Sequence, residues 1–471
     1  MSKSAGGTSP GYLAWSPNRS YLFALNSRAT GITGGAVKSF SINPSDGKLT
    51  LINTESTGGE GPAHLCVHPS GKFVFVAHYG SGHVASIPVN ANGTLDTATT
   101  VLPVAPVGYT PSKPGVFGPN AHMVMTNKSG TRLYVPCLDY DYVAIYNINA
   151  TTGALTPNAP ATAVVDSITS SRPGPRHMAF SADEKYAYVI NELNSTMTKF
   201  NHNTTTGAMT AQTSLSTLST GSHSDYTAAH VAVSPDNRTL YGSNREKIHT
   251  GRSSIASYRI DQMTGGLSLR GHETGGGEIR HPRDFTLDPT GKIMLVASSD
   301  ANVVLLFGIN VNGDLINTGK KISYVKAPTF VGVMPKASVL TTLQISPLTP
   351  TLVVDAKQTF TVNGFDQFGL AMATTAPQWR IVTGPGVINP TTGEFTAPSS
   401  ADNTTIEVSD GGKTANTTVK TEIAGGGSTS SDGGGGGGGG CGLGSGAASW
   451  LILLGGLLLV LRTSRHRDIM R

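Results

Sequence analysis

The sequence predicts an all-β protein whose largest part is a β-propeller, and three observations lead to this prediction. Only 13% of the 471 residues are charged, and Gly, Thr, Ser and Asn are frequent. Short β-branched and aromatic runs alternate with turns rich in Gly, Asn, Asp and Pro, whereas long stretches of helix-forming residues are absent. A hairpin-like segment also recurs six times at a nearly constant spacing, which is typical of a repeat architecture.

The recurring hairpin is clear between Arg172 and Leu193, where apolar and polar residues alternate on both sides of a short turn. The six turns follow one another at intervals of 52, 59, 54, 53 and 54 residues. They are marked by Pro17, Pro69, Lys128, Ala182, Pro235 and Pro289. Each hairpin precedes a further strand and a second tight turn, such as SDGKL or TTGAL, whose glycine supplies the positive φ of a hairpin turn. Each repeat therefore predicts about four strands, and such sheets bury their faces by packing around a common axis.

The segment 327–335 predicts one more inner strand without a hairpin partner. We therefore expect a propeller of the seven-bladed type in residues 8–335, with six complete blades and one strand of a seventh. The strands that would complete this blade are expected to be missing from the N-terminus. A start codon assigned too far downstream would explain this, and also why MSKSAGGTSPGY does not predict a signal peptide. The alternative is a six-bladed ring with an additional edge strand.

Charged residues and histidines gather at the open ends of the repeated hairpins. Residues equally far from a hairpin turn should face each other, and this symmetry pairs Arg176 with Glu192. The same symmetry gives three further pairs: His64 with His78, His230 with Arg245, and Arg283 with Ser299. Because the first strand of each blade lines the channel of a propeller, we expect these side chains to converge at one mouth of the channel.

The ring predicted at this mouth carries excess positive charge. Arg176, Arg245 and Arg283 face one evident carboxylate, that of Glu192. Positive potential favours an anionic ligand, and a guanidinium group suits a carboxylate or a phosphate. The alternative is a polar plug in which the Arg–Glu pairs only satisfy one another. No HExxH motif or carboxylate cluster is present, and a cationic ring opposes a cation, so we expect neither a metal nor another cofactor.

Five segments of the chain resemble the lactonase family of seven-bladed propellers, which includes a bacterial type of 6-phosphogluconolactonase and the fungal carboxymuconate cyclases. These segments are 61–84, 118–148, 174–197, 234–246 and 281–304, and the GPRH…NEL pairing is the most specific match. The resemblance covers about residues 8–335 and implies metal-free chemistry on a lactone or its open acid. The family's active-site residues fall on His122, Arg176, Glu192 and Arg245. Three positions depart from the family pattern, which tends to have His at Asn120, an acidic residue at His230 and Gly at Glu246.

We therefore expect a hydrolase that opens the cyclic ester of an anionic sugar lactone or a related lactone. Arg176 and Arg245 would bind the anionic group and polarise the lactone carbonyl. His122 or Glu192 would activate water, and the sequence does not choose between them. The candidates for further substrate binding are His64, His230 and Arg283. An isomerase of the carboxymuconate cyclase kind and a non-catalytic surface propeller that binds glycan or protein remain as alternatives.

The net charge argues against a nucleic-acid partner. The formal charge is +5, of which the ten C-terminal residues, with four Arg and one Asp, account for +3. The rest of the chain has a formal charge of about +2, and its sequence shows no basic patch with interleaved aromatic residues. We expect a monomer that binds a small lactone.

The C-terminal third predicts three further parts. Residues 339–423 suggest a β-sandwich and resemble bacterial Ig-like domains, with Trp379 in the core, and residues 424–440 form a Gly/Ser-rich linker. Residues 441–471 combine Cys441, a short hydrophobic helix ending at Leu461, which we expect to be a transmembrane segment, and an Arg cluster. They resemble the C-terminal sorting signals of Gram-negative bacteria. In that interpretation the tail is cleaved near Cys441, which is the candidate for lipidation. The alternative is a plain transmembrane anchor. Either arrangement predicts a propeller displayed at the cell envelope or cell surface.

Overall fold

The structure, a computed structural model, describes most of the chain outside the C-terminal region. The described residues are 10–27, 32–44, 46–105, 118–165, 172–219, 223–248, 251–323, 325–335, 340–366, 371–423 and 457–463. Contacts divide the chain into two compact units, one comprising Met1–Pro335 with Gly456–Arg471 and the other Lys336–Gly455. In the described residues the regular structure is β-strand, apart from three short 3-10 helices: η1 (Leu138–Tyr140), η2 (His223–Asp225) and η3 (Gly275–Gly277).

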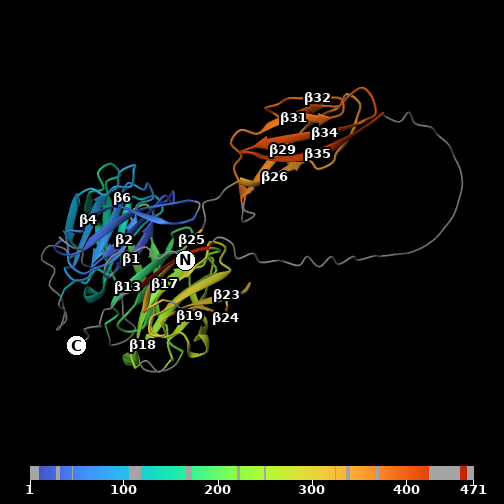
Figure 1. The fold of residues 1–471 in the computed structure, drawn as a ribbon. Helices are drawn as coiled ribbons and strands as arrows, with labels where there is room; N and C mark the ends of the chain where they lie inside the picture. The colour runs from blue at the N-terminus through green and yellow to red at the C-terminus, as the bar shows by residue number, and fades with distance from the viewer. Residues whose placement is uncertain are drawn as a thin grey trace, which may run out of the picture. The chain divides into compact units, whose positions relative to one another are not determined.

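The first unit contains six four-stranded antiparallel sheets, each formed by four consecutive strands (Figure 1). The first sheet comprises β1 (Pro10–Trp15), β2 (Tyr21–Asn26), β3 (Ala36–Ile42) and β4 (Leu49–Ser56). The second comprises β5 (Pro62–Val67), β6 (Phe73–His78), β7 (His83–Pro88) and β8 (Thr100–Pro103). The third comprises β9 (Met125–Thr126), β10 (Arg132–Cys137), β11 (Tyr142–Ile148) and β12 (Leu155–Val164). The fourth sheet comprises β13 (Pro175–Phe180), β14 (Tyr186–Asn191), β15 (Thr196–His202) and β16 (Met209–Ser216). The fifth comprises β17 (Tyr226–Val233), β18 (Thr239–Glu246), β19 (Ser254–Ile260) and β20 (Leu267–Glu273). The sixth comprises β21 (Pro282–Leu287), β22 (Ile293–Ser298), β23 (Val303–Ile309) and β24 (Leu315–Ile322).

The six repeats predicted from the sequence are therefore the six blades. The glycine of the second turn adopts a positive φ in every blade, as the turn sequences predict. These glycines are Gly47, Gly93, Gly153, Gly207, Gly265 and Gly313. At Gly153 a side chain is excluded as well, because a Cβ atom there would lie 2.4 Å from the Phe73 ring of the preceding blade.

Hydrophobic cores fill the spaces between neighbouring blades. Phe23 and Leu25 of the first blade, for example, pack with Val74 and Val76 of the second, and all four side chains are completely buried. Each blade thus buries its apolar faces against the next, because a single four-stranded sheet would leave both faces in water.

The predicted unpaired strand is β25 (Pro328–Pro335), and it closes the ring. Its Phe330 packs with Leu13 of the first blade, and its Val331 packs with Leu295 of the sixth blade. The strand contacts β1 of the first blade, near which it is labelled in Figure 1, and β21 and β22 of the sixth. The strand therefore takes the position of a seventh blade.

The C-terminal apolar segment differs from the expected transmembrane helix where the structure describes it. Leu457–Thr463 form strand β36, which pairs antiparallel with β25. An edge strand presents unpaired N–H and C=O groups, and an apolar segment that adds to the edge satisfies them. Within the described residues, no helix is both long enough and apolar enough to cross a membrane. The predicted linker, Cys441 and the final residues of the predicted tail lie outside the described residues.

The inner hairpins carry β-bulges at their open ends, and these change the predicted register. The structure pairs Pro175 with Asn191 and His177 with Ile190, which leaves Arg176 in a bulge. Bulges at the same place leave Ala63 and Arg283 between ladder pairs. The symmetric pairs predicted for the other hairpins are therefore wrong: His64 lies opposite Ala77, Arg245 lies opposite Thr227, and Ser298 lies opposite Pro282.

The bulges matter because each inserts one extra residue and redirects the side chains around it. Consecutive residues such as Arg176 and His177 can then both contact residues of the channel, where a regular strand would point them to opposite faces.

The second unit is a separate all-β body with a core of its own (Figure 1). Its sheets have the orders β26-β29-β30, β27-β35-β34-β31 and β28-β33-β32. The strands are β26 (Leu340–Ser346), β27 (Thr351–Val353), β28 (Lys357–Thr359), β29 (Thr361–Asp366), β30 (Ala371–Met372), β31 (Gln378–Thr383), β32 (Val387–Ile388), β33 (Glu394–Thr396), β34 (Asn403–Asp410) and β35 (Lys413–Glu422). Trp379 is buried in the core together with Phe360 and Phe395, as the sequence predicts.

Candidate active site

The open ends of the inner hairpins bring together a buried group of charged side chains, which we call the arginine layer. It comprises Arg176, Arg245 and Glu192, with His122 and Arg283 beside them. Arg176 follows the first residue of β13, Glu192 directly follows β14, and Arg245 lies near the end of β18. The structure therefore brings together the four residues whose roles the sequence resemblance implied.

Glu192 is held between the two arginines. Its Oε2 lies 2.8 Å from Nε of Arg176, and its Oε1 lies 2.7 Å from Nη2 of Arg245. Both arginine side chains are only 3% exposed, and each also donates to a main-chain carbonyl, Arg176 to Ala229 and Arg245 to Ala228. Burial alone would raise the pKa of Glu192, but the charges of Arg245 and Arg176 outweigh burial and hold it far below its ordinary value. Glu192 is therefore ionised and committed to the two guanidinium groups.

His122 is the uncharged member of the layer. Its ring is buried, with its centroid 5.6 Å from that of Tyr79 and 5.2 Å from that of His177. Burial, reinforced by the charge of Arg176, lowers its pKa well below 6.5, so the ring is neutral at neutral pH. Its Nδ1 atom has no hydrogen-bond partner among the described residues. His122 therefore combines a neutral ring with an unused nitrogen.

Arg283 and an outer group of polar side chains complete this end of the channel. Arg283 is partly exposed, and its charge acts on Glu192, His122 and Tyr79, which places it beside the layer. Around the layer, Asn120 Nδ2 donates to Asp139 Oδ2 at 2.6 Å. Arg172 forms ion pairs with Asp139 and Asp141 at 3.3 and 3.1 Å. Asn120 thus belongs to a local network in which two carboxylates, Asp139 and Asp141, share one cation, Arg172.

A second group, the histidine layer, lies further along the inner strands, away from their open ends. It comprises His64, His177, His230 and Asp284. The ring centroid of His177 lies 5.4 Å from that of His64 and 5.1 Å from that of His230. Tyr12 stacks on His64 with a centroid distance of 4.0 Å. His64 and His230, which we expected beside the substrate, thus lie behind the arginine layer because of the bulges.

Burial determines the charge state of the histidine layer. Burial lowers the pKa of His64 and His177 well below 6.5 and that of His230 to about 3. The charge of Arg176 adds to the effect at all three rings. The pKa of Asp284 is raised well above its ordinary value, also by burial. The sequence analysis did not select His177 or Asp284, although both are the second residues of RH and RD dipeptides that open inner hairpins.

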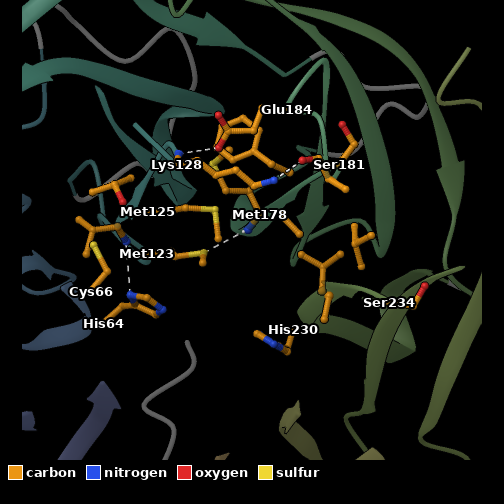
Figure 2. Close-up of a pocket in the computed structure, with 18 of the residues that line it drawn as sticks. His64, Cys66, Met123, Met125, Lys128, Met178, Ser181, Glu184, His230 and Ser234 are labelled. Carbon is orange, nitrogen blue, oxygen red and sulfur yellow. Dashed lines mark hydrogen bonds between the residues drawn. The ribbon is translucent and has the colours of Figure 1, made fainter. Parts of the chain in front are cut away.

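The opposite end of the channel, at the hairpin turns, is an apolar cavity of about 650 Å³ that we call the methionine pocket (Figure 2). Met123, Met125, Met178 and Phe180 supply much of its wall. His64 and His230 also line this cavity, whereas the arginine layer does not. Burial raises the pKa of the Cys66 thiol in its wall to about 12, which removes its reactivity as a thiolate. Lys128 and Glu184, at two of the hairpin turns, add polar side chains to the wall of this cavity.

Among the described residues, no three His, Cys, Asp or Glu side chains are grouped so that they could hold a metal ion. The side chains of the arginine layer supply guanidinium groups, which can stabilise negative charge, and an imidazole, which can accept a proton.

Comparison with known proteins supports this fold. The family profile described as "Lactonase, 7-bladed beta-propeller" matches residues 1–333. The 6-phosphogluconolactonase of Bacillus subtilis is 28% identical over 298 residues, which is 63% of this chain and 79% of the relative. The 6-phosphogluconolactonase of Formosa agariphila is 30% identical over the same length, covering 63% of this chain and 80% of the relative.

A solved structure supports the same assignment. The periplasmic gluconolactonase of Pseudomonas aeruginosa superposes with a TM-score of 0.59 at 25% identity, over 70% of this chain and 90% of that chain. The match of a single family profile to most of the chain, together with the blades and the closing strand, settles the classification: the chain belongs to the lactonase family of seven-bladed β-propellers.

Proposed function

We propose that this chain hydrolyses the cyclic ester of an anionic sugar lactone, of the 6-phosphogluconolactone kind, at the arginine layer. The observation that carries the proposal is the pair of buried arginines around Glu192, with the unused nitrogen of His122 beside them. Relatives named 6-phosphogluconolactonase support a phosphorylated lactone as the substrate.

His122 suits the role of general base better than Glu192 does. A carboxylate whose pKa is strongly lowered by two arginines has little affinity for a proton. His122 is neutral, and its low pKa arises partly from the charge of Arg176. An anionic substrate would offset this charge and raise the pKa of His122 in the complex, so that binding itself prepares the base.

The reaction then follows from these groups. Water attacks the lactone carbonyl carbon while His122 accepts its proton, and the guanidinium groups stabilise the oxyanion that forms. The ester bond to the ring oxygen breaks, and this oxygen takes up the proton from His122 as it leaves. The product is the open hydroxy acid. Glu192 keeps Arg176 and Arg245 in place throughout.

The location of the enzyme is a separate part of the proposal. We infer that residues 339–423 form an Ig-like spacer and that processing or lipidation at Cys441 places the monomeric enzyme in the bacterial envelope. The periplasmic relative and the separate core around Trp379 support this inference. Radiolabelled fatty acid should enter the full chain in Gram-negative cells and should not enter Cys441→Ser. Equal labelling of both chains would rule out Cys441 as the site.

The proposed activity is tested with the purified full chain in a pH-stat assay. The substrates are 6-phosphoglucono-δ-lactone, glucono-δ-lactone and a carboxylated muconolactone, and the control is Arg259→Ala, which removes an exposed arginine of β19. We expect the highest kcat/KM for the phosphorylated lactone, in the control as in the wild type. Turnover no faster than the uncatalysed background for all three lactones would contradict the proposal, and a preference for glucono-δ-lactone would contradict the anionic substrate.

A further inference from the structure

The histidine layer contains a set of polar contacts that ends on Arg176, and the one between His230 and Asp284 is longer than a hydrogen bond. Nη1 of Arg176 lies 3.3 Å from Nε2 of His177. Nδ1 of His177 lies 2.8 Å from Nδ1 of His230, and Nε2 of His230 lies 3.7 Å from Oδ1 of Asp284. The four side chains come from β13, β17 and β21, the inner strands of three consecutive blades. The contacts therefore connect the arginine layer to the interior of the ring.

Hydrogen-bonding chemistry gives this set of contacts a single direction. A guanidinium group only donates, so Nε2 of His177 must accept, and the proton of the neutral ring must lie on Nδ1. His177 then donates to Nδ1 of His230, whose own proton must lie on Nε2, facing Asp284. The direction depends on neutral rings, which burial supplies by lowering the pKa of both histidines. Protonation of His177 would place an N–H group against the Arg176 guanidinium.

The surroundings leave these residues few other polar contacts. His177 faces the rings of His64, His122 and Tyr12, and His230 packs on Phe285 with a centroid distance of 4.9 Å. Arg176, His177 and Asp284 are each no more than 3% exposed. A buried guanidinium group needs defined partners: Nη1 of Arg176 contacts both the Ala229 carbonyl and Nε2 of His177, and Nε lies against Glu192.

We propose that His177, His230 and Asp284 form a positioning chain that holds the guanidinium of Arg176 in the orientation required to bind the anionic lactone. The inference rests on the proposed function, because it assigns the three residues a role in substrate binding by Arg176. None of the three contacts the reacting atoms. They act through Arg176, as orienting partners do behind other buried binding groups.

The first test measures the chain itself and needs no activity. In the wild-type protein with ¹⁵N-labelled histidine, NMR should show one pair of imidazoles with ¹⁵N–¹⁵N coupling across a hydrogen bond. One ring of the pair should be protonated at Nδ1 and the other at Nε2. Loss of the coupling in the His230→Gln variant assigns the pair to His177 and His230. Absence of the coupling at neutral pH, or a coupled pair with a different protonation pattern, would overturn the proposal even if the variants do not fold.

The second test separates positioning from structural support. Asp284→Asn and His230→Gln should raise KM for 6-phosphoglucono-δ-lactone about tenfold, because a displaced Arg176 binds the anion less well. They should also lower kcat, because Arg176 stabilises the oxyanion as well. The control is His68→Gln, which removes a buried histidine that binds the Gly130 carbonyl outside the channel. A fall in kcat at unchanged KM would show a structural role and would overturn the proposal. A wild-type protein without lactonase activity would refute the proposed function. The NMR result would still decide whether the positioning chain of His177, His230 and Asp284 exists.

Discussion

The two ends of the propeller channel differ in chemistry although the same strands build both. At the open ends of the inner hairpins, Arg176 and Arg245 surround Glu192. At the turns, Met178 and Phe180 line a cavity of about 650 Å³. Arg176 and Met178 are only two residues apart on β13. The two ends therefore differ in charge and in hydrogen-bonding capacity, and this difference, not the cavity volume, is the reason why we propose the arginine layer as the reactive end.

The strongest test of this difference replaces one residue of β13 in the arginine layer and one in the wall of the methionine pocket. Arg176→Ala should lower kcat/KM for 6-phosphoglucono-δ-lactone by about 10³-fold, because it removes both anion binding and oxyanion stabilisation. Met178→Leu should change it less than about threefold, since the volume of the side chain is nearly preserved. Steady-state kinetics of both variants give kcat/KM relative to that of the wild type. Equal losses in the two variants would remove the distinction between the two ends.

His122→Asn should lower kcat by about 10²-fold and leave KM nearly unchanged, because the base acts on water and not on the bound anion. His202→Gln is the control, since His202 is buried in an outer strand against Tyr134. Pre-steady-state and steady-state kinetics distinguish the chemical step from product release. A variant with wild-type kcat would return Glu192 to consideration as the base.

Glu192→Gln should lower the free energy of unfolding of the propeller by about 2 kcal/mol, because it leaves two buried arginines without their counter-charge. The folded-state pKa of Glu192 is lowered, so its contribution to stability is complete above the unfolded pKa of about 4.3 and is lost as the pH falls below that value. Urea unfolding at pH 7 and pH 4 should therefore show a smaller difference between variant and wild type at pH 4. A difference that grows toward pH 4 would contradict the assigned charge state.

The smallest expected effect concerns the histidine layer. Burial lowers the folded-state pKa of His64, so the unfolded chain binds more protons below pH 6.5 and the stability of the propeller decreases as the pH falls through that value. Between pH 7 and pH 5.5, His64→Gln should reduce this loss by about 1 kcal/mol. Residues 336–455 contain no histidine, so the unfolding of the second unit serves as an internal control. An unchanged pH dependence in His64→Gln would show that His64 is charged in the folded protein.

The sequence predicted the blades well because their determinants are local. The alternation of the hairpins and the glycine turns each depend on a few neighbouring residues, and Gly153 and its equivalents adopt the expected backbone. The Arg176–Glu192 pair was also predictable, because both residues lie at one end of the same hairpin.

The parts that the sequence did not predict depend on residues far apart in the chain. A bulge shifts the register at Arg176 and Arg283, and hairpin symmetry alone cannot place it. His177 and Asp284 were missed for this reason, since a regular strand would turn them away from the channel. The apolar segment ending at Leu461 suits a helix or a strand, and in the described part the open edge of β25 supplies a partner. The methionine pocket results from packing among several blades and has no local signal.

The central claim is that the lactone is opened at the arginine layer and not in the methionine pocket. A crystal structure of the full chain with 6-phosphogluconate, the open acid, tests this claim most directly. We predict that the product lies against Arg176 and Arg245, with its carboxylate near the unused nitrogen of His122. Product bound among Met123, Met125 and Met178, with the arginine layer unoccupied, would contradict the claim.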